Sequence, residues 1–219
     1  MAELRTEEEQ LNALKTWWNE NGKSLVIGVA AAVALVVGWQ SWQARQQQQA
    51  AAASALYLNL TEAVQLAALQ QDDSQYATAR HLADQLKQEF ADSSYARFAA
   101  LALAAVAVDK REYERAAQEL DWVLASAKEM DDVGRVATLR KAALMQQQAQ
   151  EQAAVDLLQK LDAASFEAER QELLGDLFKA LNKPEEAYAA YDAALQAVGG
   201  EQLRPLLKMK RDDLAGVRS

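Results

Sequence analysis

The sequence predicts an all-α protein with one transmembrane helix near its amino terminus, followed by an α-solenoid of stacked helix pairs and a capping helix. Three observations predict this class. About a fifth of the 219 residues are alanine, and cysteine is absent. Glycine and proline do not occur between Gly38 and Gly134, although a chain of strands and hairpins needs them about every 8 to 12 residues. A single uncharged apolar segment precedes small residues that recur at regular spacing.

Residues 1–23 are expected to form an amphipathic segment in the cytoplasm. Leu11, Leu14, Trp17 and Trp18 fall at helical spacing. This is the arrangement of a helix that lies at the interface between lipid and water. A contact with a partner protein is the alternative role for these side chains.

Residues 24–44 are predicted to be the transmembrane helix. The segment carries no charge between Lys23 and Arg45, and about 21 helical residues span roughly 31 Å, the thickness of the hydrocarbon core of a bilayer. A buried core helix and a cleavable signal peptide are the alternatives. The first seldom lacks polar side chains on every face, and the second does not follow a long acidic region. Within the span, Gly28 and Ala32 form a small-xxx-small pair that would let a partner helix pack closely.

Aromatic and basic residues predict how this helix is placed. The residues expected at the two membrane interfaces are Trp17 and Trp18 before the span and Trp39 and Trp42 after it. Three basic residues, Arg5, Lys15 and Lys23, precede the span. The first twenty or so residues after the span contain one basic residue, Arg45. The positive-inside rule therefore predicts a cytoplasmic amino terminus and a carboxy-terminal domain across the membrane. The absence of cysteine is compatible with a bacterial periplasmic domain.

Residues 45–55 contain many Gln and Ala residues and no helix breaker, so they are predicted to continue the membrane helix as a stalk. Residues 56–219 then form the periplasmic domain. Within it, residues 165–197 match the tetratricopeptide signature, in which small and aromatic residues recur at fixed positions on two consecutive helices. The matching residues are Leu174, Gly175, Phe178, Ala187, Tyr191 and Ala194, with Pro184 at the start of the second helix.

Weaker copies of this pattern precede it and predict about four degenerate tetratricopeptide repeats. The copies are Ala67, Ala79, Ala83 and Leu86; Ala104, Ala116, Leu120 and Val123; and Ala142, Ala154, Leu158 and Leu161. Their spacing is close to the 34 residues of this repeat. An irregular helical bundle is the alternative. Residues 202–217 are expected to be the capping helix, with Leu203, Leu206, Leu207 and Leu214 inward and Lys208, Lys210, Arg211, Asp212 and Asp213 outward.

The first helices of such repeats line a concave groove that binds an extended peptide or a partner's helix. The positions expected in this groove are Val64, Phe98, Leu101, Val108, Val136, Leu139, Gln146 and Gln147, with Glu169, Glu172 and Asp176 toward the last repeat. Phe98→Asp and Leu101→Asp are therefore expected to remove a partner and leave the fold intact. The alternative is that the capping helix or a neighbouring repeat covers these positions.

Composition disfavours several classes of function. The net charge of −9 is unsuited to a nucleic acid, whose phosphates are bound by clustered Lys and Arg. A cysteine-ligated metal site is excluded because cysteine is absent. With His81 as the single histidine, neither a histidine-based zinc cluster nor a catalytic triad with a spare imidazole can be assembled. The Asp72-Asp73, Asp131-Asp132 and Asp212-Asp213 pairs suit helix ends, and no glycine-rich phosphate loop is present. We therefore expect no catalytic site, metal, cofactor or small-molecule substrate.

The layout of the chain resembles a known family. The segment ALKTWWNENGKSLVIGVAAAVALVVGWQSW (residues 13–42), the degenerate repeats and the closing LLKMKRDDLAG (residues 206–216) are similar to the YfgM-like ancillary subunits of the bacterial Sec translocon. The resemblance covers essentially the whole chain. It implies a single-span inner-membrane protein that works beside the Sec channel with a membrane-anchored periplasmic chaperone and assists newly exported chains.

Two hypotheses follow. The first is a non-enzymatic adaptor or co-chaperone at the translocon, which rests on the resemblance. The alternative is a repeat scaffold for the assembly of an envelope complex such as a secretion or pilus system.

Overall fold

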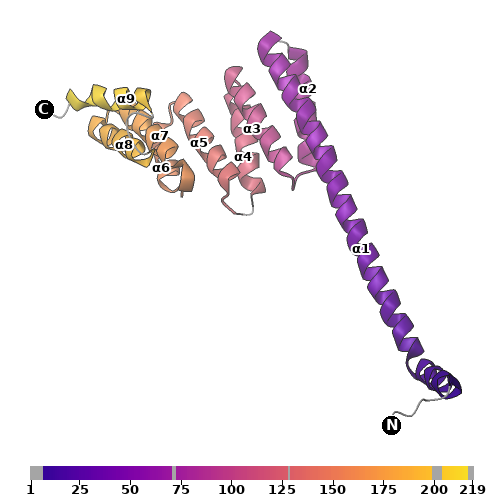
Figure 1. The fold of residues 1–219 in the computed structure, drawn as a ribbon. Coiled ribbons are helices and arrows are strands. Elements are labelled where there is room, and N and C mark those ends of the chain that lie inside the picture. Colours follow the sequence, from indigo (N-terminus) through magenta and orange to yellow (C-terminus); the bar gives the residue numbers. More distant parts are fainter. Residues whose placement is uncertain (1–6, 71–72, 128, 199–203, 217–219) are drawn as a thin grey trace. The chain divides into compact units, whose positions relative to one another are not determined.

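The computed structural model describes residues 7–70, 73–127, 129–198 and 204–216. Over these residues the chain forms α-helices and one short 3-10 turn, and contains no strand (Figure 1). The elements are α1 (Glu7–Gln70), α2 (Asp73–Glu89), α3 (Ser94–Asp109), α4 (Tyr113–Ser126), α5 (Asp132–Gln147), α6 (Glu151–Gln159), η1 (Ala164–Phe166), α7 (Glu167–Ala180), α8 (Pro184–Ala197) and α9 (Pro205–Ala215). The all-α class is confirmed.

The chain divides into two compact units, Met1–Ala52 and Ala53–Ser219. The described part of the first unit is the amino-terminal stretch of α1. The second unit contains the rest of α1 and all later helices. Residues 24–44 and 45–55, the predicted span and stalk, are helical throughout. The boundary between the two units lies inside the predicted stalk.

The helices of the second unit pack in chain order. From α2 onward each long helix contacts the next one along the chain, and α3 contacts α5 as α5 contacts α7 (Figure 1). These contacts arrange the helices in antiparallel pairs, in which α3 pairs with α4, α5 with α6 and α7 with α8. Contacts limited to near neighbours are the mark of an α-solenoid.

Small residues lie where paired helices cross. Ala79, Ala116, Ala154 and Ala187, which the sequence places at the repeating small position of each second helix, are all fully buried. A small side chain at a crossing lets two helices approach until their ridges and grooves interlock. The recurring alanines therefore set the spacing of the helices.

Gly175 shows this close approach most directly. A Cβ atom built on Gly175 would lie 2.4 Å from Cδ1 and Cε1 of Tyr191, which is closer than two carbon atoms can approach without a shift. The Tyr191 ring is fully buried, and its hydroxyl donates a hydrogen bond of 2.8 Å to Asp176 Oδ1. The aromatic ring thus fills the space that the glycine leaves.

The turns inside the pairs share one backbone geometry. Arg111, Ala149 and Asn182 have positive φ angles of 61°, 56° and 57°. In each turn the next residue donates its N–H to a carbonyl five positions earlier, as in the 2.9 Å bond from Gln150 N to the Met145 oxygen. This is a Schellman ending, in which a left-handed residue satisfies carbonyls at the end of a helix. As the sequence predicts, α8 begins at Pro184.

Charged side chains link neighbouring pairs. Lys87 on α2 places Nζ 2.9 Å from Oε2 of Glu119 on α4, whose side chain is only 6% exposed. Arg97 on α3 donates two bonds of 2.6 Å to Asp131, the residue that caps α5 by accepting the Gly134 N–H. Buried apolar clusters and these links together hold successive pairs in register.

The capping helix α9 differs in part from the sequence prediction. Leu207 and Leu214 are buried as expected, but Leu206 is 75% exposed. Leu207 and Leu214 are seven residues apart and so define one buried stripe, from which Leu206 is rotated by about 100°. Lys210 and Arg211, expected outward, are half-buried and face the core side. Leu203 lies outside the described residues.

Candidate functional site

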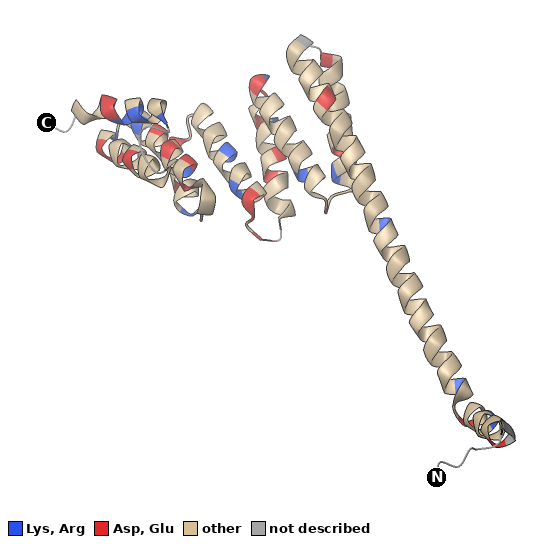
Figure 2. Ribbon diagram, in the orientation of Figure 1, with Lys and Arg blue, Asp and Glu red and all other residues tan. Residues whose placement is uncertain are grey.

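The apolar stretch of α1 in the first unit exposes its side chains. Leu25, Val26, Ile27, Val29, Val33, Leu35, Val36 and Val37 are between 45% and 76% exposed. Among the described helices this is the one that is long and apolar enough to cross a membrane, judged by length and composition. Figure 2 shows the corresponding part of α1 as a long ribbon with few charged residues. Apolar side chains exposed in this number need lipid or protein around them.

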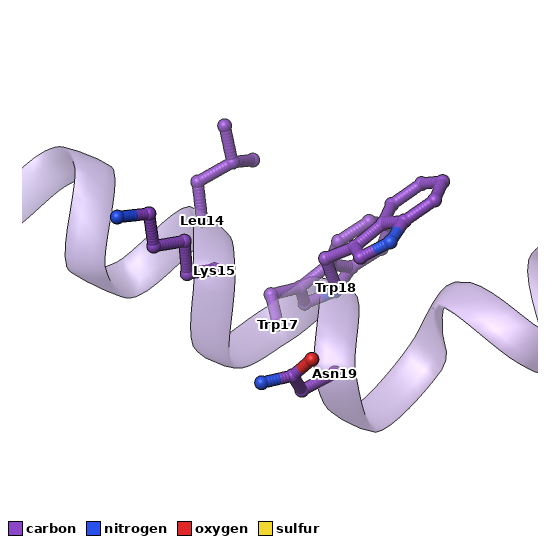
Figure 3. A pocket seen from close by; sticks show the side chains of 5 residues that line it. All are labelled: Leu14, Lys15, Trp17, Trp18 and Asn19. Atoms are coloured by element: carbon purple, nitrogen blue, oxygen red, sulfur yellow. The ribbon is translucent and has the colours of Figure 1, made fainter.

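Tryptophans flank this stretch, with exposed rings. Trp17, Trp18, Trp39 and Trp42 are between 48% and 64% exposed, and the ring centroids of Trp39 and Trp42 are 5.1 Å apart. Trp17 and Trp18 help to line an open hollow of about 720 Å³ (Figure 3). Indole joins an apolar ring to one N–H donor, which suits the boundary between lipid and water.

A second hollow follows the small residues of the predicted span. It measures about 480 Å³ and is lined by Trp17, Asn21, Ser24, Leu25, Gly28, Val29 and Ala32. A Cβ atom added to Gly28 would meet no atom within 4 Å. The backbone is therefore open to close approach along this strip, the property for which Gly28 and Ala32 were singled out.

The positions predicted for the groove lie on the successive first helices α1, α3 and α5 and on the acidic face of α7. Val64, Val108, Val136, Leu139 and Gln146 are half-buried, and Gln147 is exposed. Phe98 is 37% exposed, and its ring centroid lies 6.1 Å from that of Tyr57. Phe98 is thus the most open of the large apolar groups among these positions.

Leu101 lies in the core and not on an open surface. Only 8% of the residue is exposed, and it belongs to the buried cluster that joins α3, α4 and α5. The neighbouring helix α5 packs against α3 here, and Arg140 Nη1 on α5 donates a hydrogen bond of 3.1 Å to the Leu101 carbonyl oxygen. The placement of Leu101 on an open groove is therefore corrected, and Leu101→Asp is now expected to destabilise the fold.

At the carboxy-terminal end, α9 neutralises the acidic side chains of α7. Lys210 Nζ lies 2.8 Å from Asp176 Oδ1 and 3.0 Å from Glu172 Oε1, and Arg204 Nη1 lies 2.9 Å from Glu172 Oε2. Arg204 also lies 3.6 Å from Glu169. Here the capping segment covers the predicted groove positions, the alternative that the sequence left open. Lys210 therefore faces α7, where carboxylates compensate its charge.

Burial and hydrogen bonding alter the ionisation of this cluster. Burial acts to lower the pKa of Lys210, but hydrogen bonds to Asp176 and Glu172 outweigh it, so the pKa is raised above its ordinary value. Burial first, and then the hydrogen bond to Asp176, raises the pKa of Tyr191. Lys210 therefore stays charged and Tyr191 stays protonated near neutral pH.

His81 and the other polar side chains assemble no ligand set in the part of the chain that the structure describes. His81 lines a shallow hollow with Asp84, Gln85, Gln88 and Glu89. No group of three or more His, Asp or Glu side chains among the described residues is placed to hold a metal ion.

Sequence reasoning did not identify four exposed apolar side chains on α1 and α9 as exposed, and it had placed Leu206 inward. Leu58 and Leu69 are 64% and 82% exposed, and Leu206 and Met209 are 75% and 61% exposed. A signal for Leu69 was present, because the repeat register places it at a position that is buried or half-buried in the other repeats. Only the packing of the neighbouring helices shows that the position is open here.

Comparison with known proteins places the chain in a family. The model of the tetratricopeptide repeat-like domain matches residues 15–216. An ancillary SecYEG translocon subunit of Haemophilus influenzae is 31% identical over 214 residues, covering 98% of this chain and 100% of the relative. Proteins of the same name from Escherichia coli and Neisseria gonorrhoeae are each 29% identical, covering 95% and 98% of this chain and 97% and 100% of their own lengths. The chain therefore belongs to the tetratricopeptide repeat-like family of ancillary SecYEG translocon subunits.

Proposed function

We propose that this chain is a single-span protein of the bacterial inner membrane and a non-enzymatic adaptor of the Sec translocon. In this proposal residues 1–23 lie in the cytoplasm, residues 24–44 cross the membrane, and residues 45–55 connect the span to a periplasmic domain of four tetratricopeptide repeats. The observation that carries the proposal is the end-to-end match to proteins named ancillary SecYEG translocon subunits. The exposed apolar stretch of α1 supports the anchor.

The repeat domain would act by holding proteins together. Its helix surfaces carry exposed apolar groups but no assembled catalytic or metal-binding group in the described residues. We infer that the groove contacts a membrane-anchored periplasmic chaperone or newly exported chains beside the translocon. The role is that of a scaffold or co-chaperone, in which binding energy comes from burying apolar side chains.

Recovery of partners from detergent-solubilised membranes tests the adaptor role. The tagged full-length protein is expected to recover Sec channel subunits together with a periplasmic chaperone. Recovery of secretion or pilus components without Sec subunits would instead support a scaffold for an envelope complex. A fusion of alkaline phosphatase to the carboxy terminus is expected to be active in intact cells, and an inactive fusion would reverse the orientation.

Phe98 provides a test of the groove. Phe98→Asp places a charge on the most open large apolar position among those proposed, so recovery of the chaperone or exported chain is expected to fall about tenfold, as for an interface hot spot. The matched control is Gln118→Asp, which adds the same charge at an exposed position on the second helix α4. Both variants are expected to keep their helical circular dichroism and melting temperature. Equal recovery by the two variants would remove Phe98 from the site.

A further inference from the structure

The repeat register identifies one face of each first helix that packs against the preceding pair. Counted from the small residue of each repeat (Ala67, Ala104, Ala142, Gly175), the face comprises the residues nine, five and one before it and two after it. These sets are Leu58, Glu62, Leu66 and Leu69 on α1; Tyr95, Ala99, Leu103 and Val106 on α3; Val133, Ala137, Lys141 and Leu144 on α5; and Phe166, Arg170, Leu174 and Leu177 at the start of and along α7. We call this set the entry face.

In three repeats the second helix of the preceding pair covers the entry face. On α3, Leu103 lies fully buried in one cluster with Leu86 of α2. On α5, Lys141 pairs with Asp121 of α4. On α7, Arg170 Nη1 donates to the carbonyl oxygen of Leu158 on α6, and Leu174 and Leu177 lie in the cluster that contains α6 residues.

The entry face of α1 is open. Leu69 is 82% exposed, whereas at the same repeat position Leu144 and Leu177 are 3% and 0% exposed and Val106 is half-buried. Leu58, at the other end of the face, is 64% exposed. Leu66, between them on the face, is half-buried. Among the described helices of the second unit, α9 caps the carboxy-terminal end of the repeats.

We propose that the entry face of α1 is a docking surface for an amphipathic helix of another protein, which takes the place that a preceding second helix takes in the other repeats. The repetition of the fold supplies the argument, since one face geometry accepts a helix three times within the same chain. This surface is separate from the groove and does not depend on the groove assignment. Burial of Leu58 and Leu69 supplies the driving force, because exposed leucines gain from leaving water.

Charge at the centre of the entry face selects the partner. Glu62 is exposed between Leu58 and Leu69, at the position that Ala99, Ala137 and Arg170 hold in the other repeats. A helix with Lys or Arg among its apolar residues would pair with this carboxylate. A second copy of this chain docked in parallel through the same face would bring two Glu62 side chains together, which like-charge repulsion disfavours.

Site-specific photocrosslinking in native membranes tests the proposal with the full-length chain. The probe p-benzoylphenylalanine replaces Leu58 or Leu69, and the matched control replaces Met130, an apolar residue that is 48% exposed between α4 and α5. We expect the probes at 58 and 69, but not at 130, to label a helix of another protein. Glu62→Lys should reduce that labelling about tenfold, the effect of reversing one charge in an interfacial pair, whereas Glu62→Gln should reduce it less.

Charge exchange and melting complete the test. Replacing the basic residue nearest the crosslink in the partner by Glu should restore labelling of the Glu62→Lys chain. The melting temperature of both Glu62 variants should equal that of the wild type, because the side chain is exposed. Equal labelling at position 130, labelling of a second copy of this chain, or labelling that ignores Glu62→Lys would each overturn the proposal. Loss of Sec subunits in the pull-down described above would leave this result unaffected.

Discussion

Gly175 packs against the Tyr191 ring where α7 and α8 cross, and the contact leaves no room for a methyl group on Gly175. Gly175→Ala is expected to lower the free energy of unfolding by about 1 to 3 kcal/mol, the usual cost of overpacking a core, because its Cβ would lie 2.4 Å from the ring. Chemical denaturation followed by circular dichroism measures this loss. The expectation is specific to the repeat that carries a tyrosine at this crossing.

A double-mutant cycle shows whether the ring is the cause. Tyr191→Leu reproduces the combination found in α3 and α4, where Ala104 crosses Leu120 and both are buried. Tyr191→Leu should therefore cost less stability in the Gly175→Ala background than in the wild type. Additive losses would show that the clash with the ring does not explain the glycine.

Asp131 gives the stability of the domain an acid dependence. Two hydrogen bonds from Arg97, aided by the N–H of Gly134, hold the pKa of Asp131 well below its ordinary value near 4, although partial burial opposes them. A carboxyl group whose pKa is lower in the folded state stabilises the fold above its unfolded pKa. The stabilisation is lost as pH falls from about 5 through the lowered pKa.

Asp131→Asn isolates this charge, because Asn caps a helix about as well as Asp. The Asp131 side chain is 49% exposed, so solvent screening limits the expected cost at pH 7 to about 1 kcal/mol or less. Denaturation curves of wild type and variant should differ at pH 7, begin to converge as the pH falls below about 4, and coincide only below the lowered pKa of Asp131. The control is Asp92→Asn at an exposed position. A difference that persists unchanged in acid would contradict the role of the charge.

For single residues, the sequence predicts which small residues lie at helix crossings better than it predicts which larger side chains are buried or exposed. Gly175 and the four recurring alanines were identified because their spacing is a local property of the chain. The burial of Leu101 and the inward position of Lys210 were missed. Both depend on a neighbouring helix, since α5 covers Leu101 and the carboxylates of α7 hold Lys210.

Among the elements, the turns inside the helix pairs carry a cost that the sequence does not reveal. Ala149 has a φ of 56°, a conformation that costs an L-residue roughly 1 kcal/mol and glycine almost nothing. Ala149→Gly is therefore expected to leave stability unchanged or raise it by up to about 1 kcal/mol, after the entropy cost of glycine in the unfolded chain. Denaturant midpoints measure the change.

The control for this turn is the same substitution four residues later. Ala153→Gly lies at an exposed position inside α6 and should lower stability by about 1 kcal/mol, the helix propensity difference between the two residues. Equal losses from Ala149→Gly and Ala153→Gly would show that the left-handed turn is not strained. Asn182→Gly should change little, because Asn tolerates this conformation better than Ala.

Element type follows from local sequence, whereas the orientation of α9 does not. The turn before Pro184 and the helical stalk could be predicted because proline, alanine and glutamine act on their own backbone. In α9 the buried stripe is shared by leucines and by Lys210 and Arg211. Hydropathy alone placed these cations outside, because it takes no account of their partners. Glu172 and Asp176 on α7 pair with Lys210, and Asp192 on α8 pairs with Arg211.

For the whole molecule, the sequence alone separates the apolar residues of the predicted membrane span from the alanines of the repeats. The uncharged apolar segment is continuous, whereas the alanines of the repeats recur at regular spacing. The first lies in one of the two units into which the chain divides, and the second lie in the other. The open entry face of α1 could not be predicted. The equivalent positions of the later repeats are buried or half-buried, and the preceding second helix that covers them has no counterpart before α1 among the described elements.

The solenoid architecture predicts that damage at one end stays local. Leu207 is 1% exposed and packs with Tyr191, Ala194 and Leu195 of α8, so Leu207→Ala should cost about 2 to 5 kcal/mol, as for other buried leucines. Since each pair contacts only its neighbours, hydrogen exchange should show lost protection in α7, α8 and α9 and unchanged protection in α3 and α4. The adjacent Leu206→Ala, at a 75% exposed position, is the control and should leave exchange unaltered. Equal loss of protection in α3 and α8 would mean that the domain unfolds as one unit, and that the neighbour contacts bind the pairs more tightly than a one-dimensional array allows.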